Sequence, residues 1–307
     1  MTGARFCVCV PARDEADRLP VLLDALAQQD IAGPIPVAIC VNNTRDDSLG
    51  AIAQAQARWA DRLALDVASH DLPADRAHAG TARGLAMDAG LACVDPATGV
   101  LISTDADTRP PCDWITQILQ AIDTGLDLVG GRIVIDDADP PGDAVMAMRT
   151  TLDDYWAQVR AVEDSVDPCA WDAAPRHGDH TGASLAITAS LYRTAGGVPA
   201  IPSGEDRALI ENAIAAGGRL GHPITVWTRV SARTTGRAAG GMAEHMRALE
   251  DRLARGEPTL VPSLDRWRER AAWRKAVRNR ADTAAHLVAL ERALPPMPCD
   301  MVLEPRR

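Results

Sequence analysis

The alternation of short apolar runs with longer amphipathic stretches is the feature that most constrains the fold of this 307-residue chain. Short runs rich in β-branched residues alternate with segments whose apolar residues recur at i, i+3 and i+4. This rhythm is typical of an α/β fold, in which helices cover a mostly parallel sheet. We predict strands at residues 6–10, 37–41, 63–68, 100–103, 128–135, 184–187 and 225–228.

The intervening segments carry the helical period. They predict helices at residues 19–29, 49–59, 81–93, 114–122, 145–162 and 207–216. Residues 163–181 show no period and are rich in Asp, Pro and His, so we expect a long loop, and long loops in compact domains are often lids. From about Gly236 the pattern turns helical with no further strand. We therefore expect an α/β domain over residues 1–235 and a helical extension over 236–307.

Composition narrows the class of protein. The chain is 47% apolar, which is enough for a sizeable core. Its net charge of −10 argues against general binding of nucleic acid, which requires clustered cations. The seven cysteines lack paired spacing, so we interpret them as reduced core residues. No apolar run is long enough for a membrane span and the N-terminus lacks a signal-peptide core, so we expect a cytoplasmic protein.

Residues 266–280 depart from this acidic balance because they hold seven basic side chains. A basic helix can lie on an anionic membrane or meet an anionic substrate, but it can also be a solvated helix face. On a helix, Trp267 and Trp273 would point about 120° apart, which is poor geometry for one membrane-dipping stripe. We therefore expect a solvated face.

Two carboxylates, Asp105 and Asp107, follow directly after the apolar run at residues 100–103. At the carboxyl end of a strand, both would lie in the crevice where open α/β sheets bind ligands. Divalent cations in such crevices are usually held by one or two carboxylates together with substrate phosphates. The pair therefore suggests a cation and a diphosphate, although by itself it also fits the cap of a helix beginning near Pro111.

Six motifs occur in order between residues 6 and 230. They read VPARDE (10–15), CVNNTRDDS (40–48), HAGTARG (78–84), TDADT (104–108), TGAS (181–184) with AGGV (195–198), and SGEDRAL (203–209). In this order they resemble the motifs of family-2 glycosyltransferases, which have the nucleotide-sugar-binding GT-A fold. The resemblance implies a nucleotide-binding half over about residues 1–110 and an acceptor half over about 111–235.

The resemblance also assigns residues to the donor nucleotide. It places Pro11, Ala12 and Glu15 beside the base and ribose, and it points the Arg83 guanidinium at the nucleotide. Asn43 lies where the family commonly has an aspartate, and an amide can donate as well as accept, so recognition of the base can differ from the usual one. Glu15 fits equally well as a helix-start acid, and Asn43 as an ordinary turn residue.

The remaining assignments concern the metal and the chemistry. The resemblance makes Asp107 the direct ligand of Mn²⁺ or Mg²⁺, while Asp105 bonds the ribose or reaches the metal through water. Asp206 matches the base that takes the proton of the acceptor hydroxyl, and Glu205 orients the acceptor or a loop. Both acids also suit the first turn of a helix.

The sequence thus predicts a metal-dependent hexosyltransferase that uses a UDP- or GDP-linked sugar. Inversion at the anomeric carbon is expected from the family. A retaining enzyme acting on a small anionic acceptor is the alternative, because Arg229, Arg233 and Arg237 would suit such an acceptor. A sugar nucleotidyltransferase would need a glycine-rich loop after the first strand. A non-catalytic nucleotide-sugar-binding protein would have no reason to keep all four acids.

Several points stay open at this level. No spacing singles out a role for His177, His180 or His222. Arg233 and Arg237 either clamp an anion or lie in an exposed basic loop. The helical extension either completes the acceptor site or pairs subunits into a homo-oligomer, and the sequence does not choose between these.

Overall fold

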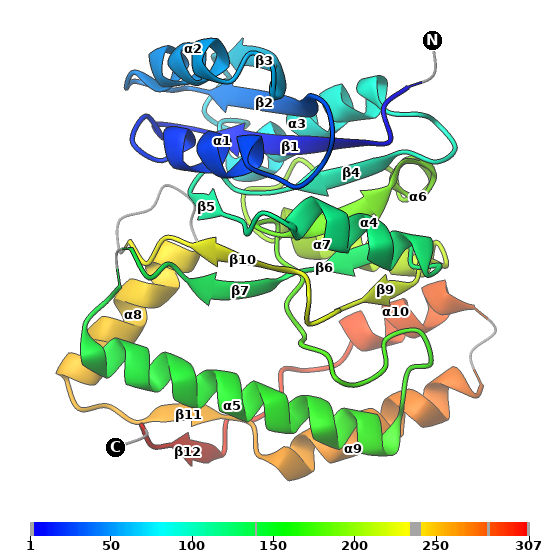
Figure 1. Ribbon diagram of the computed structural model, residues 1–307. Coiled ribbons are helices and arrows are strands. Elements are labelled where there is room, and N and C mark those ends of the chain that lie inside the picture. The colour runs from blue at the N-terminus through cyan, green and yellow to red at the C-terminus, as the bar shows by residue number, and fades with distance from the viewer. Residues whose placement is uncertain (1–2, 139, 234–240, 281–282, 306–307) are drawn as a thin grey trace.

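The computed structural model describes residues 3–138, 140–233, 241–280 and 283–305, and its centre is a seven-stranded sheet in the order β3-β2-β1-β4-β8-β6-β9 (Figure 1). β8 runs antiparallel to both of its neighbours, and the other pairs in this sheet are parallel. The strands are β1 (Phe6–Ala12), β2 (Ile35–Asn42), β3 (Leu63–His70), β4 (Val100–Ser103), β6 (Leu128–Gly130), β8 (Leu185–Thr188) and β9 (Leu220–Gly221). The predicted α/β class with a mostly parallel sheet is confirmed.

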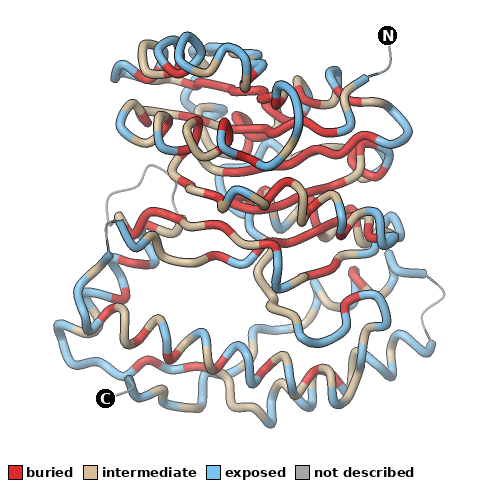
Figure 2. The backbone as a smooth tube through the Cα atoms, in the orientation of Figure 1, coloured by how far each residue is buried: buried red, intermediate tan, exposed pale blue. Residues whose placement is uncertain are grey.

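Helices cover both faces of this sheet. Alternate residues of β1 belong to different cores: Val8 and Val10 pack on one face, and Cys7 and Cys9 on the other. The first face is covered by α1 (Leu19–Ala27), α2 (Ser48–Arg58) and α4 (Trp114–Asp123). The second face is covered by α3 (Ala79–Cys93), α6 (Ala189–Thr194) and α7 (Glu205–Ala215). Figure 2 shows the buried residues concentrated along the strands between these two layers.

The strand predicted at residues 128–135 is two strands in different sheets. After β6 the chain leaves the main sheet, and β7 (Arg132–Ile135) joins β5 (Thr108–Arg109) and β10 (Trp227–Val230) in a small sheet of order β5-β10-β7. The change occurs at Gly131, where a Cβ atom would lie 1.9 Å from Ser184 Oγ. Only glycine permits this close approach.

The C-terminal part forms a further layer against the long helix α5 (Asp143–Val166), which extends beyond the predicted residues 145–162 (Figure 1). The layer contains α8 (Met242–Ala254), α9 (Leu264–Arg278) and α10 (Ala284–Arg292), with β11 (Thr259–Val261) paired to β12 (Met301–Leu303). The prediction of no strand after Gly236 is wrong. Each of these strands has only three residues, too few to show a period, and they form because Val261 and Met301 pack on Tyr155 of α5.

The basic segment 266–280 is bound largely within the chain. Lys275 Nζ donates to Val166 O at 2.9 Å and Arg278 Nη1 to Asp167 Oδ1 at 2.7 Å, so cations of α9 hold the end of α5. α10 packs on α7, where Arg292 Nη2 donates to Asn212 Oδ1 at 3.1 Å. The basic segment is therefore not simply a solvated helix face as expected. Several of its cations bind other parts of the chain and hold the C-terminal layer in place. The predicted boundary at 235–236 lies outside the described residues.

The cysteine prediction is correct in part. All seven cysteines are free thiols, and Cys7, Cys9 and Cys40 are core residues as expected. Cys93, Cys112 and Cys299 are exposed, because helix ends and loops bring them to the surface. Within the ranges described above, none of the helices combines the length and apolar character that a membrane span requires.

Candidate functional site

The candidate site is organised around a buried guanidinium, that of Arg83 in α3. Its Nη2 donates to Asp105 Oδ1 at 2.8 Å, and its Nε donates to Glu205 Oε1 at 3.0 Å. Its Nη1 donates to Ser103 Oγ at 2.7 Å and to the carbonyl of Gly182 at 3.0 Å. Arg83 is only 5% exposed, so its donors are used inside the protein. The structure brings together three residues that the sequence had placed in separate motifs.

Local sequence makes room for this guanidinium. A Cβ atom at Gly182 would lie 2.3 Å from Arg83 Cζ, so the backbone passes over the guanidinium only because residue 182 is glycine. Burial opposes the charge of Arg83, but Asp105, Glu205 and Asp206 raise its pKa above the ordinary value. Arg83 therefore stays a cation throughout the physiological range.

A second guanidinium, that of Arg233, binds the acids on the other side of Asp105. Its Nη1 and Nη2 donate to the two carboxylate oxygens of Glu15 at 2.8 and 2.6 Å, and Nη2 lies 2.9 Å from Asp107 Oδ2. The Glu15 backbone N–H donates to Ser48 Oγ at 2.9 Å. Glu15 therefore acts neither as a simple helix-start acid nor as an open polar group, because it holds an arginine from the end of β10.

Asp107 lies where negative charges crowd. Burial raises its pKa to about 6, Asp105 and Glu15 add to the rise, and Arg233 opposes it. Its side chain is 18% exposed and that of Asp105 is 38% exposed, so both carboxylates reach the surface of the crevice. A cation bound here would reduce the repulsion among Asp105, Asp107 and Glu15, which Arg233 offsets only in part.

Carboxylates outnumber guanidinium groups across the whole network. Two arginines serve five acids, which are Glu15, Asp105, Asp107, Glu205 and Asp206. In the described part of the chain, no three Cys, His, Asp or Glu side chains are grouped as a complete metal site. Magnesium-type ions usually take one or two carboxylates plus phosphates and water. Asp105 and Asp107 fit that requirement, with the other ligands coming from a bound diphosphate and from water.

Asp206 lies at the start of α7, and two backbone groups hold it. Gly182 N donates to its Oδ2 at 2.8 Å and Arg207 N to its Oδ1 at 2.7 Å. Gly182 therefore binds Arg83 through its carbonyl and Asp206 through its N–H. This one residue joins the two acid groups that the sequence assigned to donor and acceptor.

The predicted contacts to the base are placed differently. Asn43 Nδ2 donates to Leu72 O at 2.8 Å, and Leu72 N donates to Asn43 Oδ1 at 3.2 Å, so both ends of this amide brace a turn. The adjacent Asn42 is buried, and its Nδ2 has no hydrogen-bond partner among the described residues. Pro11 and Ala12 form the last two residues of β1 and pair with β2. Arg237 lies outside the described residues.

Sequence reasoning missed a cluster of histidines beside Asp206. His180 Nδ1 lies 3.1 Å from His222 Nε2, and His222 Nδ1 lies 2.8 Å from Asp172 Oδ2. The His177 and His222 ring centroids are 5.6 Å apart. Members of the cluster are 42 and 50 positions apart, so no local spacing could have identified it.

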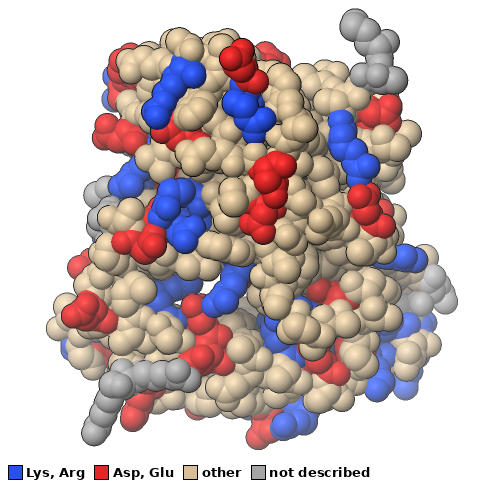
Figure 3. Space-filling view, viewed as in Figure 1, with Lys and Arg blue, Asp and Glu red and all other residues tan. Residues whose placement is uncertain are grey.

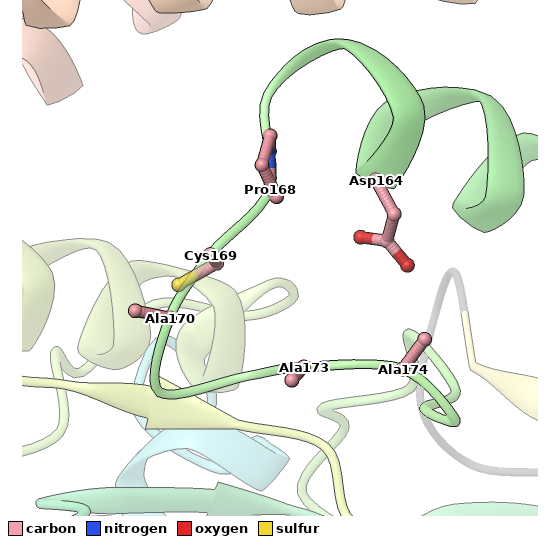
Figure 4. Close-up of a pocket in the computed structure, with 6 residues that line it drawn as sticks. All are labelled: Asp164, Pro168, Cys169, Ala170, Ala173 and Ala174. Atoms are coloured by element: carbon pink, nitrogen blue, oxygen red, sulfur yellow. The ribbon is translucent and has the colours of Figure 1, made fainter.

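The two cavities found in the structure lie away from these residues. One of about 360 Å³ is formed by the end of α5 and the loop that follows it (Figure 4), and its lining is Asp164, Pro168, Cys169, Ala170, Ala173 and Ala174. Another of about 360 Å³ lies between α1 and β5. Neither lining includes a residue predicted to bind the donor, the metal or the acceptor hydroxyl, although Arg229, the residue suggested for an anionic acceptor, lines the second. On the face shown in Figure 3, acidic and basic side chains are mixed and the surface is hollowed between the strands and the α5 layer.

Comparison with known proteins then decides the family. Residues 7–157 match the model of glycosyl transferase family 2. The chain contains a family-2 glycosyltransferase domain. The matched range includes Glu15, Arg83, Asp105 and Asp107, and it ends before the segment that carries Asp206. None of the curated proteins matches this transferase.

Solved structures resemble the transferase in fold. The mannosyltransferase PcManGT from Pyrobaculum calidifontis, in complex with GDP-Man and Mn²⁺, is 17% identical with a TM-score of 0.50, covering 95% of this chain and 80% of that chain. Staphylococcus aureus TarS 1–349 with UDP-GlcNAc is 14% identical with a TM-score of 0.52, covering 96% and 77%. The match to TarS 1–349 with UDP has 14% identity and a TM-score of 0.49, covering 76% of this chain and only 61% of that chain.

Replacing Arg83 tests whether it holds the site together. We expect Arg83→Met to lower the free energy of unfolding by about 3–5 kcal/mol, because the buried Glu205 carboxylate would lose its cation. The matched control is Arg58→Met, which removes an exposed pair with Asp24 and should cost less than about 1 kcal/mol. Urea denaturation at neutral pH measures both. Equal effects of the two substitutions would contradict the central role of Arg83.

The crowding at Asp107 predicts a pH-dependent stability. Its pKa is raised from 3.8 to about 6 in the folded protein, so its ionisation destabilises the fold as pH rises through that window. We expect Asp107→Asn to raise the free energy of unfolding at pH 7.5 by about 2–3 kcal/mol and to have little effect at pH 4. Denaturation at both pH values, with Asp61→Asn on the exposed surface as control, measures this. A destabilised D107N protein at pH 7.5 would refute the argument.

Proposed function

We propose that this transferase moves a glycosyl group from a UDP- or GDP-linked sugar to an acceptor hydroxyl, with a divalent ion on Asp105 and Asp107. The observation that carries the proposal is the acid network, in which five carboxylates share two guanidinium groups at the carboxyl ends of β1 and β4. A ligand that brings a diphosphate and a divalent cation together satisfies such a site better than either does alone.

The donor side is proposed from the first half of the chain. Asp107 would be the direct ligand of Mn²⁺ or Mg²⁺, and Asp105 would reach the ion or the ribose while Arg83 holds it in place. When bound, the ion would neutralise the charge that builds on the leaving diphosphate. The backbone of Pro11 and Ala12, at the end of β1, would contact the base and ribose. The complexes of PcManGT with GDP-Man and Mn²⁺ and of TarS with UDP-GlcNAc support this class of donor.

Asp206 is proposed as the base for an inverting transfer. Two backbone N–H groups hold its carboxylate, which would keep the base in one position for the acceptor hydroxyl. Glu205, the adjacent acid, accepts from Arg83 through Oε1 and would act by positioning the start of α7. In the reaction, the acceptor oxygen bonds to the anomeric carbon, the bond to the diphosphate breaks with its electron pair, and Asp206 takes the proton.

The alternative of a small anionic acceptor loses much of its support. Arg233 is engaged with Glu15 and Asp107, and Arg229 lies 3.4 Å from Asp137 and stacks on Trp227. Two of the arginines on which that alternative depended are therefore used within the protein. These contacts favour a neutral hydroxyl as the acceptor of the proposed transfer.

Calorimetric titration tests the donor site. UDP and GDP are titrated into the purified protein with and without Mn²⁺, and we expect one nucleotide to bind at least tenfold more tightly with the metal. Asp107→Asn should remove the metal-dependent part and leave any metal-free binding unchanged, while Asp61→Asn should behave as wild type. If neither nucleotide binds under either condition, a non-catalytic role moves ahead of the proposed transfer.

Substituting Asp206 tests the chemistry separately. We expect Asp206→Asn to lower kcat about 10²–10⁴-fold, because the base is lost while its shape is kept. The dissociation constant of the nucleotide should stay within about twofold, since Asp206 lies on the acceptor side. Release of UDP or GDP from UDP-GlcNAc or GDP-Man, with water as the acceptor, gives the rate. A D206N enzyme with undiminished kcat would exclude Asp206 as the base.

A further inference from the structure

A hydrogen-bonded chain of side chains lies next to Asp206 and has no part in the function proposed so far. Asp172 Oδ2 is 2.8 Å from His222 Nδ1, and His222 Nε2 is 3.1 Å from His180 Nδ1. Asp172 also accepts a hydrogen bond from the His222 backbone N–H at 2.6 Å. Asp172 and His222 are both buried. Two imidazoles and a carboxylate in series resemble the arrangement that orients a histidine in acid–base catalysis.

The chain fixes which nitrogen of each imidazole carries a proton. Burial alone would raise the pKa of Asp172, but hydrogen bonds from His222 and the charge of Arg176 lower it, so Asp172 is an ionised acceptor. His222 Nδ1 therefore donates to Asp172, and in the form of His222 with this single ring proton the lone pair lies at Nε2. His180 must then donate from Nδ1, which leaves the lone pair of neutral His180 on Nε2.

His180 is neutral at physiological pH and its Nε2 is accessible. Burial, together with His222 and Arg160, lowers its pKa to about 4 against the opposing charges of Asp179 and Asp206. In the part of the chain that the structure describes, His180 Nε2 has no hydrogen-bond partner, and it is not among the enclosed polar atoms.

The position of His180 places that lone pair on the acceptor side. His180 precedes Gly182 by two residues, and Gly182 N donates to Asp206 at 2.8 Å. A Cβ atom at Gly130 would lie 2.9 Å from His180 Cβ, so this segment packs closely against the end of β6. His180 and Asp206 therefore lie on adjoining segments, close enough for the charge of Asp206 to act on the pKa of His180.

We propose that His180 Nε2 binds the acceptor beside Asp206, with His222 and Asp172 as positioning residues that keep this nitrogen free of a proton. The inference rests on the proposed function. It adds a class of acceptor: a molecule with two neighbouring O–H groups, as in a sugar or polyol. One O–H gives its proton to Asp206 as its oxygen attacks, and the other donates a hydrogen bond to His180. Water, which also has two O–H groups, can take the same place.

Nitrogen NMR tests the tautomer without any activity. With ¹⁵N-labelled histidine at pH 7, we expect His180 to be protonated on Nδ1 and not on Nε2. In His222→Phe, the acceptor for Nδ1–H is gone, so we expect His180 to shift toward the Nε2-protonated form. Asp172→Asn is a second, smaller change that should alter the His222 and His180 signals together. A wild-type His180 protonated on Nε2 would overturn the proposal.

Hydrolysis of GDP-Man and UDP-GlcNAc tests the role in catalysis. We expect His180→Ala to lower kcat at least tenfold, with the dissociation constant of the nucleotide within twofold of wild type. His180→Gln, whose amide oxygen can still accept a hydrogen bond, should recover part of the loss. His177→Ala is the matched control, because His177 lies in the same loop and contacts His222 but is outside the chain of hydrogen bonds. An unchanged kcat in H180A would refute the role.

The two tests separate this inference from the proposed function. If wild type neither binds nucleotides nor hydrolyses either sugar nucleotide, the proposed function fails, and an Nε2-protonated His180 would then remove the inference as well. If donor hydrolysis proceeds and responds to Asp206→Asn but not to His180→Ala, the function stands and the inference fails.

Discussion

The buried guanidinium of Arg83 is the interaction on which the site depends. It comes from the first turns of α3, and it binds one acid from the end of β4, another from the start of α7 and the backbone of the segment before β8. A charge that is almost fully buried is stable only with all of these partners present. Elements that are far apart in the sequence are therefore held at fixed spacing, and the carboxylates keep their positions before any ligand arrives.

Local patterns were sufficient for the architecture but not for the pairings within it. Periodicity placed the six predicted helices and the strands of the main sheet except β9, because each such segment buries one face and its period is visible in sequence. It failed at residues 128–135, where a close contact at Gly131 turns one apolar run into strands of two sheets. It also failed at β11 and β12, which exist only because they pack on Tyr155.

In the candidate site, too, local motifs predicted individual residues but not the contacts between distant ones. Motifs identified Arg83, Asp105, Asp107 and Asp206, because each lies at the end of a strand or the start of a helix. Sequence could not show that Arg83 holds acids instead of reaching out to a nucleotide, or that Asn43 braces Leu72. Those facts depend on partners far away in the chain, as with Glu15 and Arg233, which are 218 residues apart. Residues that pair over such distances form no short motif, so their contact cannot be predicted from the sequence.

Negative charge at this site opposes the stability of the fold. Burial and two neighbouring acids raise the pKa of Asp107, so its ionised form is held at a cost that a substitution by asparagine would remove. Proteins keep such strained charge where a ligand needs it, since the binding of a cation relieves it. The charge of Asp172, by contrast, has partners within the fold, because Arg176 Nη1 lies 3.3 Å away and His222 Nδ1 lies 2.8 Å away. Gly182 lies between the two sides, with its carbonyl on Arg83 and its N–H on Asp206. Any shift of that residue would move the donor acids and the proposed base together, so the distance between leaving group and acceptor is set by one backbone segment.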